Sequence, residues 1–421
     1  MGKSKLILFL LFISLLNNTN AYSQINDSID TYTSDSMMID ILQKEGIPIT
    51  SNNKVKLLKS GKEKFNDLFD EVRKAKHSIE LEYFNFRNDS IAKTLFELLA
   101  QKAREGVKVR ALFDAFGNMS NNKPLKKSHL KAIRESGVEI IKYDPIRFPW
   151  INHVLKRDHR KIIIIDGKIG YTGGMNIADY YITGLPKIGD WRDMHVKIEG
   201  EAVKNLQDIF ISMWEKITKE KIDSDFNKYK DSIDAPVING CNVAILDRWP
   251  GKTPKIMREF YVNSINSAKE RIQIINPYFV PTSSIQKALE KALKRGVNVQ
   301  IMIPGKSDIY FTPDAAFYNV NKLRKKGAEI YIFNGGFHHA KIMMIDSLYC
   351  TVGSTNLNSR SLRYDYEVNA VIFNKKVASE LINTFNNDKS QSTLLTKEIY
   401  DKRTPWKKFV GWFANVLTPF L

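Results

Sequence analysis

Two short stretches of the chain repeat one pattern of chemically active residues. Residues 158–167 read D-H-R-K-I-I-I-I-D-G, and residues 339–346 read H-A-K-I-M-M-I-D. In each stretch a histidine and a lysine stand two residues apart before an apolar run that predicts a buried strand. Because side chains alternate along a strand, the histidine and the lysine should leave the same face. The repeated residues are His159, Lys161 and Asp166 in the first stretch, and His339, Lys341 and Asp346 in the second.

Paired histidines and lysines suit chemistry at a phosphodiester. Two ammonium groups would neutralise the charge that grows on the non-bridging oxygens. One imidazole can attack phosphorus while the other protonates the departing alkoxide, and the roles then reverse for the incoming alcohol. This two-step route through a covalent phosphohistidine needs no metal and no other cofactor. The residues alone do not decide which histidine attacks.

Each histidine also needs a carboxylate that fixes its tautomer and supports the imidazolium. Glu367 follows His339, and Asp193 follows His159 at a roughly similar distance along the chain. We therefore expect each carboxylate to serve the histidine of its own half.

Further polar residues accompany the two motifs. Asn176 and Asn356 follow them in G-G-M-N and G-S-T-N, and their amides could donate to phosphate oxygens. Asp166 and Asp346 complete the motifs at the far end of each predicted strand, where we favour a turn or ion-pair role over catalysis. His195 stays open between a structural role and a role in the site. A structural role is expected for His77, His129, His153 and His338.

The elements that must position these residues are also repeated. Short β-branched runs alternate with helical patterns, which predicts an α/β fold with mixed sheets flanked by helices. Residues 103–109 match 293–299, and 130–140 match 320–330 at the same offset; each reads as helix, glycine stop, strand. We therefore predict two similar halves that pack about a pseudo-twofold axis and bring both histidine–lysine pairs to one point.

The ends of the chain differ in character from these halves. Lysines precede the apolar run 6–16, as in a secretory signal peptide, with an uncleaved anchor as the alternative. The body should then be exported to the cell envelope, peripheral on or anchored to a membrane. The predicted organisation is a signal peptide at 1–23, a flexible linker at 24–50, a first half at 51–235, a second half at 236–390 and an amphipathic tail at 391–421.

The tail predicts a helix that Thr404 caps and Pro405 opens. This pattern is typical of an interfacial helix in a lipid headgroup layer, and a helix docked on the enzyme's own core is the alternative. The residues expected on one apolar face are Trp406, Phe409, Val410, Phe413, Val416 and Leu417.

Charge and cysteine content limit the partners and the compartment. The formal net charge of +18 favours a polyanion, either nucleic acid or an anionic lipid surface. Two cysteines, Cys241 and Cys350, are too few for a disulfide framework and lack the spacing of a zinc site. Whether they pair is left open.

Two H-x-K-x4-D motifs, each followed by G-G/S-x-N, resemble the phospholipase D superfamily. Residues 159–176, the segment W-R-D-M-H at 191–195 and the tail from Pro405 are similar to bacterial cardiolipin synthases. This resemblance implies that two phosphatidylglycerol molecules give cardiolipin and glycerol. It also favours His159 as nucleophile and His339 as general acid. Those synthases usually begin with two membrane-spanning helices, whereas this sequence has one short apolar segment.

Other functions use the same residues. A phospholipase D-type hydrolase of phospholipid or nucleic acid would need the same histidines and lysines, and a basic surface would suit nucleic acid equally. A non-catalytic lipid-binding module is a third possibility. The expected partners are anionic phospholipid, chiefly phosphatidylglycerol, and a membrane surface; nucleic acid belongs to the hydrolase alternative, and no obligate protein partner is inferred.

Overall fold

The computed structural model describes residues 32–145, 155–222, 240–309 and 312–416. The predicted signal peptide, the predicted division between residues 235 and 236, His153 and Leu417 lie outside these ranges.

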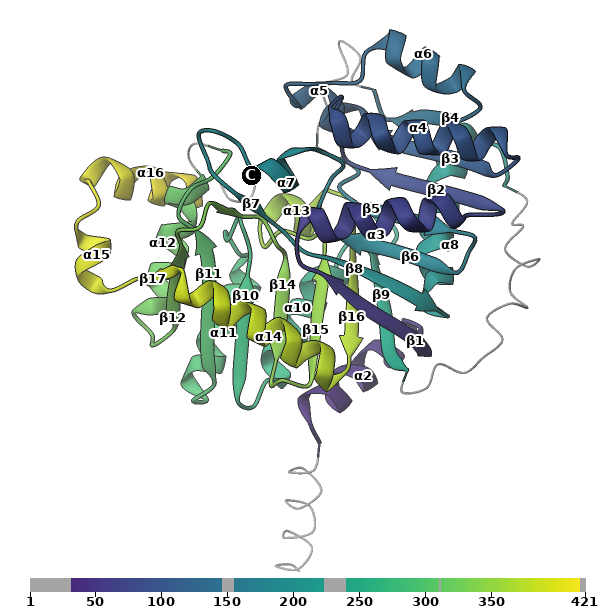
Figure 1. Cartoon of the computed structure of the whole chain (residues 1–421). Helices are drawn as coiled ribbons and strands as arrows, with labels where there is room; N and C mark the ends of the chain where they lie inside the picture. Colours follow the sequence, from purple (N-terminus) through teal and green to yellow (C-terminus); the bar gives the residue numbers. More distant parts are fainter. Residues whose placement is uncertain (1–31, 146–154, 223–239, 310–311, 417–421) are drawn as a thin grey trace, which may run out of the picture.

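One mixed sheet of fifteen strands runs through the described part of the molecule, in the order β17-β12-β11-β10-β14-β15-β16-β9-β1-β8-β6-β5-β2-β3-β4 (Figure 1). The antiparallel pairing of β1 with β9 joins the two halves. The first-half strands are β1 (Ile49–Leu58), β2 (Ser78–Tyr83), β3 (Lys108–Asp114), β4 (Glu139–Tyr143), β5 (Lys161–Ile165), β6 (Ile169–Gly173) and β8 (His195–Gly200). The second-half strands are β9 (Cys241–Arg248), β10 (Arg271–Ile275), β11 (Asn298–Pro304), β12 (Glu329–Phe333), β14 (Ile342–Ile345), β15 (Tyr349–Gly353), β16 (Glu367–Phe373) and β17 (Ser392–Leu394). A separate pair joins β7 (Trp191–Arg192) to β13 (Phe337–His338).

Helices cover this sheet, and the two halves repeat the same order of elements. The first half has α3 (Gly61–Lys74), α4 (Ser90–Arg104), α5 (Ala115–Ser120), α6 (Lys127–Glu135), α7 (Tyr180–Thr183) and α8 (Ala202–Thr218). The second half has α10 (Ile256–Ser267), α11 (Ser283–Lys294), α12 (Thr312–Arg324), α13 (Ser359–Arg363) and α14 (Lys375–Ser390), followed by α15 (Lys397–Asp401) and α16 (Pro405–Val416). The predicted duplicated α/β fold is confirmed.

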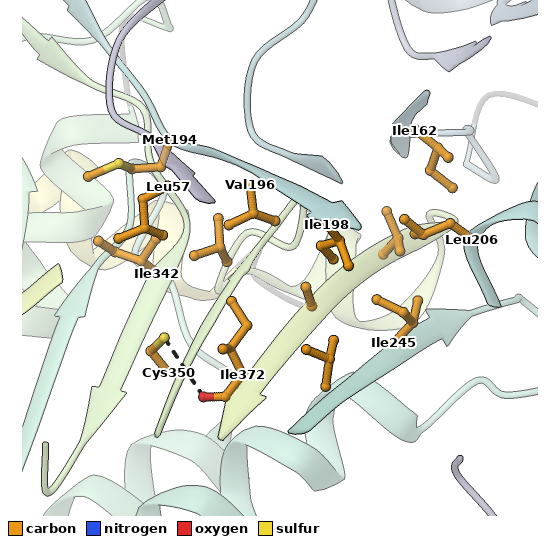
Figure 2. Packing of buried hydrophobic residues seen from close by; sticks show 14 of the residues in the cluster. Leu57, Ile162, Met194, Val196, Ile198, Leu206, Ile245, Ile342, Cys350 and Ile372 are labelled. Atoms are coloured by element: carbon orange, nitrogen blue, oxygen red, sulfur yellow. Dashed lines mark hydrogen bonds between the residues drawn. The ribbon is translucent and has the colours of Figure 1, made fainter. Parts of the chain in front are cut away.

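A shared hydrophobic core holds the halves together (Figure 2). Val196 and Ile198 from β8 lie in the same buried cluster as Ile342 and Ile372 from the second half. Both cysteines are buried and free, and the Sγ of Cys350 lies 4.0 Å from the carbonyl oxygen of Ile372. Strands of both halves therefore contribute side chains to the same core.

The predicted flexible linker at 24–50 is wrong for its described end. Residues Ser34–Lys44 form helix α2, which buries Met38 and Leu42 against α10, and β1 begins at Ile49. The prediction followed the polar residues before Met37 and overlooked the apolar residues at 37–42, which give the helix an apolar face. The start of the predicted tail is likewise part of the sheet, because β17 pairs with β12.

None of the helices in the described ranges combines the length and apolar character that a bilayer-spanning helix requires.

Candidate active site

The first histidine–lysine pair lies where β5 begins, next to the second half of the chain. The backbone amide of His159 donates to the carbonyl of Tyr366 at 3.0 Å, and the amide of Tyr366 donates to the carbonyl of Arg157 at 2.8 Å. This exchange sets the motif beside the start of β16, where Glu367 lies.

The second pair is held in the same way by the first half. The amide of His339 donates to the carbonyl of Arg192 at 2.6 Å, directly after the β13–β7 pairing of Phe337 with Trp191. This places the second motif beside Asp193.

Each histidine is therefore oriented by a carboxylate from the other half. Both carboxylate oxygens of Glu367 lie 3.1 Å from Nδ1 of His159, and Oδ2 of Asp193 lies 2.7 Å from Nδ1 of His339. The prediction that each carboxylate serves its own half is wrong, although both residues are in the site. Spacing along the chain cannot reveal a contact made across the pseudo-twofold axis. With Nδ1 beside the carboxylate, Nε2 of each ring is the nitrogen that faces away from the carboxylate.

The residues before the two asparagines make room for these carboxylates. A Cβ on Gly174 would lie 2.2 Å from Oδ1 of Asp193, so glycine is needed for the close approach. The corresponding residue in the second half is Ser354, whose hydroxyl donates to Oε2 of Glu367. Gly174 in the G-G form thus leaves space for Asp193, whereas Ser354 in the G-S form donates a hydrogen bond to Glu367.

The two lysines supply buried positive charge. Lys161 and Lys341 are almost completely buried, and each ammonium group donates to the carbonyl of the histidine two residues earlier. The ammonium of Lys341 also lies 2.9 Å from both ring nitrogens of His339. Burial lowers the pKa of Lys161 to about 7 and that of Lys341 to about 8. An anion between them would relieve this cost, so the arrangement favours a phosphate group.

The two histidines share this electrostatic environment. Burial, reinforced by the charges of Lys161 and Lys341, holds the pKa of His159 well below its usual value. Burial and Lys341 also lower the pKa of His339, while Asp193 opposes them. His159 interacts electrostatically with both Lys341 and His339, as expected for one shared site.

The carboxylates differ from each other. Burial raises the pKa of Glu367 to about 7, against the opposing charge of Lys161. Burial acts on Asp193 in the same direction, yet the charges of Lys341 and His339 bring the pKa of Asp193 below its ordinary value. Asp193 therefore carries the negative charge that can stabilise a protonated His339.

Asn176 and Asn356 are also buried in the site. In each, the side-chain carbonyl oxygen has no hydrogen-bond partner among the described residues. The buried ammonium of Lys64 donates to the carbonyls of Met175 and Asn176 at 3.0 and 3.3 Å. Sequence reasoning missed Lys64; the signal was a lysine on the apolar stripe of α3 that contains Phe65 and Leu68.

Aromatic rings lie against both histidines. Phe84, directly after β2, has its ring centroid 5.2 Å from that of His159. The ring centroid of Tyr278, shortly after β10, lies 6.0 Å from that of His339. The ring centroid of Trp191 lies 5.6 Å from the same imidazole centroid. The rings exclude water from the imidazoles on one side.

The motif aspartates lie away from this site. Asp166 accepts hydrogen bonds from the backbone amides of Lys76, His77 and Ser78, at the end of β5 opposite His159. Asp346 does the same for the three residues from Lys269 to Arg271. Both aspartates have positive φ, of 51° and 49°. Although Asp166 and Asp346 belong to the repeated motif of chemically active residues, they have the turn role that we favoured.

The remaining histidines fall into two groups. His195 is buried and accepts a hydrogen bond from the amide of Met175 at 3.2 Å, so it supports the backbone of the site. His338 points away from the site to Asp388, 3.0 Å from its Nε2, and His129 accepts the amide of Lys126 at the start of α6. The structural roles expected for His338 and His129 agree with these contacts.

Comparison with known proteins identifies the family to which the chain belongs. The family described as "Cardiolipin synthase, PLD-like domain" matches twice, over residues 68–214 and 261–389. The chain belongs to this cardiolipin synthase family of phospholipase D-like proteins. The two matched regions correspond to the two halves of the fold, and each contains one histidine–lysine motif.

Members of the family from several bacteria are similar along most of this chain. A cardiolipin synthase of Listeria monocytogenes is 35% identical over 90% of this chain and 78% of its own length. Cardiolipin synthase 1 of Staphylococcus epidermidis is 36% identical over 95% and 80%. A probable cardiolipin synthase of Bacillus subtilis is 36% identical over 89% and 73%.

Solved structures support the fold of this family member. A phosphatidylserine synthase of Haemophilus influenzae superposes with a TM-score of 0.69 at 14% identity, over 91% of this chain and all of the other. The polyphosphate kinase of Porphyromonas gingivalis gives a TM-score of 0.52 at 11% identity, over 80% of this chain and 50% of that chain.

Proposed function

We propose that this protein transfers a phosphatidyl group from one phosphatidylglycerol to another, producing cardiolipin and releasing glycerol. The observation that carries the proposal is the pair of histidines held by crossed carboxylates and flanked by buried lysines. Membership in the cardiolipin synthase family, with relatives that bear this name, supports the choice of lipid. We further propose that the enzyme works at a membrane of the cell envelope, as its lysine-led apolar N-terminus indicates.

The proposed reaction has two displacements at one phosphorus. Nε2 of His159 attacks the phosphorus of the first phosphatidylglycerol, and the bond to the glycerol oxygen breaks. His339 gives its Nε2 proton to that oxygen, so glycerol leaves neutral. The second phosphatidylglycerol then loses a hydroxyl proton to His339, and its oxygen displaces His159 to form cardiolipin.

The environments of the histidines support this division of roles. The nucleophile must be neutral, and the pKa of His159 lies well below its usual value because of burial and two lysines. The acid must form an imidazolium. Burial and Lys341 lower the pKa of His339, and Asp193, whose carboxylate is ionised, opposes them and accepts from Nδ1 of His339. Lys161 and Lys341 hold the non-bridging oxygens through both steps.

The test is a product assay with the purified full chain and phosphatidylglycerol vesicles. We expect cardiolipin and glycerol in equal amounts. His339→Ala should abolish turnover, whereas His129→Ala, on the surface helix α6, should retain it. Phosphatidic acid without cardiolipin would establish the hydrolase alternative, and cleavage of DNA without lipid turnover would establish a nuclease.

A trapping experiment tests the nucleophile separately. Phosphatidylglycerol labelled in its phosphatidyl group should leave the label on His159 when turnover by the unaltered protein is quenched rapidly with denaturant. Label on any other residue would contradict the assignment of His159.

A further inference from the structure

Helix α16 carries a cluster of large aromatic side chains that face away from the protein. Trp406 is 69% exposed, and Phe409, Trp412 and Phe413 are each close to half exposed. The rings contact one another: the ring centroid of Phe409 lies 5.8 Å from those of Trp406 and Trp412. Trp412 was not expected on the apolar face. A contiguous exposed aromatic surface of this kind marks an interaction site.

The opposite face of α16 fixes the helix on the body of the protein. Ala414 is buried against Ala315 of α12 and Val280. A Cβ on Gly411 would lie 2.4 Å from the carbonyl oxygen of Asp314, so glycine allows the two helices to meet. Arg403, just before α16, forms an ion pair with Asp314. Small residues thus dock the helix while its aromatic residues stay exposed.

This docking places α16 beside the active site. Val280 contacts Ala414, and its amide donates to the carbonyl of Leu357, the residue after Asn356. Val280 also follows Tyr278 by two residues, and the ring of Tyr278 lies against His339. Figure 1 shows α16 on the same upper side of the molecule as α7 and β7. The aromatic cluster therefore borders the rim of the second half-site.

Other exposed apolar residues gather at the same end of the strands. Tyr83 at the end of β2 pairs with both Phe113 of β3 and Lys161 of β5, so segments that follow β3 or precede β5 lie at the active-site end. The pairing of β6 with β5, and of β11 and β14 with β10, places segments that follow β6 or β11 at this end as well. Among the ten large hydrophobic residues exposed in the described ranges, eight belong to α16 or to such segments. The four outside α16 are Met119 after β3, Leu155 before β5, Ile182 after β6 and Ile309 after β11.

Positive charge accompanies this surface. Lys402 and Lys407 are exposed next to the aromatic residues, and neither forms an ion pair with any residue that the structure describes. Aromatic side chains with flanking lysines are the composition of helices that lie in the headgroup layer of anionic membranes.

We propose that the aromatic face of α16 (Trp406, Phe409, Trp412 and Phe413) docks the protein on an anionic lipid bilayer with the active site facing the lipid. The choice of a bilayer as occupant rests on the proposed function, because a site that consumes membrane lipid must reach it at the membrane. The proposal adds the surface that makes this contact and its orientation relative to His339.

The experiment measures binding of the full chain to vesicles of phosphatidylcholine mixed with phosphatidylserine, by flotation. Phosphatidylserine is not the proposed substrate, so binding is measured independently of turnover. We expect Phe409→Ser/Trp412→Ser to weaken partitioning by more than about tenfold, since two large apolar groups no longer enter the lipid. Leu394→Ser is the matched control, because Leu394 is as exposed as Trp412 but lies on the edge strand β17. It should bind like the unaltered protein.

Three results would overturn the proposal: no vesicle binding by the unaltered protein, unchanged binding by the double variant, or a dimer in solution that the double variant converts to a monomer. The last would identify a second copy of the chain as the occupant. If the double variant does not fold, Trp406→Ser, which removes the most exposed ring, replaces it. Vesicle binding without cardiolipin formation would contradict the proposed function and leave this proposal standing.

Discussion

At the scale of single residues, the two buried lysines make activity sensitive to pH near neutrality. The pKa of Lys161 is about 7 and that of Lys341 about 8, both lowered by burial. Each lysine loses its charge as the pH rises through its pKa, and the site then binds the phosphate group of the substrate more weakly. We expect kcat/KM for a soluble short-chain phosphatidylglycerol to fall as the pH increases through 7 and 8, because kcat/KM reports ionisations of the free enzyme.

Lys161→Arg is the control for this profile, since arginine keeps its charge throughout the range. In that variant the alkaline fall should depend on Lys341 alone and move toward pH 8. A profile that is flat between 7 and 8, or unchanged in the variant, would contradict the role given to the lysines.

Lys64 provides a second residue-scale prediction. Its ammonium holds the carbonyls of Met175 and Asn176, and burial keeps its pKa well below the usual lysine value. Lys64→Met should reduce kcat by about tenfold or more, because the turn that carries Asn176 loses its support. The melting temperature should not fall, because a buried amine is replaced by an apolar group.

Lys62→Met on the same helix is exposed and should change neither quantity. A parallel loss of stability and activity in Lys64→Met would show that Lys64 is needed for folding and not for positioning.

At the scale of secondary-structure elements, helix α2 is an integral part of the second half. Met38 is fully buried between α2 and α10, with the hydroxyl of Ser264 3.2 Å from its sulfur. We expect Met38→Ala to lower the free energy of unfolding by about 2–5 kcal/mol, measured by urea denaturation. Met119→Ala, at a methionine that is 62% exposed, should have little effect. Equal stabilities of the two variants would mean that α2 does not stabilise the fold.

The elements also show what the sequence could and could not predict. The repeated helix–glycine–strand segments and the isoleucine-rich strand of the first motif predicted the duplicated sheet, because their periodicity is local. The four histidine and lysine residues followed from the same repeat. The partners of His159 and His339 were assigned to the wrong halves, since Glu367 and Asp193 reach them through a contact between distant segments. Helix α2 was missed because the polar composition of the residues before Met37 was extended over the apolar residues that follow, which include Met38 and Leu42.

At the scale of the whole molecule, a single phosphate-sized ligand should tie both halves together. Orthovanadate resembles the phosphoryl group in transfer, and it would contact lysines and histidines from each half. We expect it to stabilise the protein by about 2.7 kcal/mol at a hundredfold excess over its Kd, seen as a higher melting temperature. Lys341→Met should remove this effect, whereas Lys62→Met should retain it. Equal stabilisation of the Lys341 variant would place the anion elsewhere.

The crossed hydrogen bonds between histidine and carboxylate have a consequence for how this protein can change over time. Because His159 depends on Glu367 and His339 depends on Asp193, neither copy of the motif is self-sufficient. A chain with only one motif would have to form a symmetric homodimer to obtain the same contacts. Because both copies lie in one polypeptide, they can differ in detail, as Gly174 and Ser354 do, although each copy still requires the other.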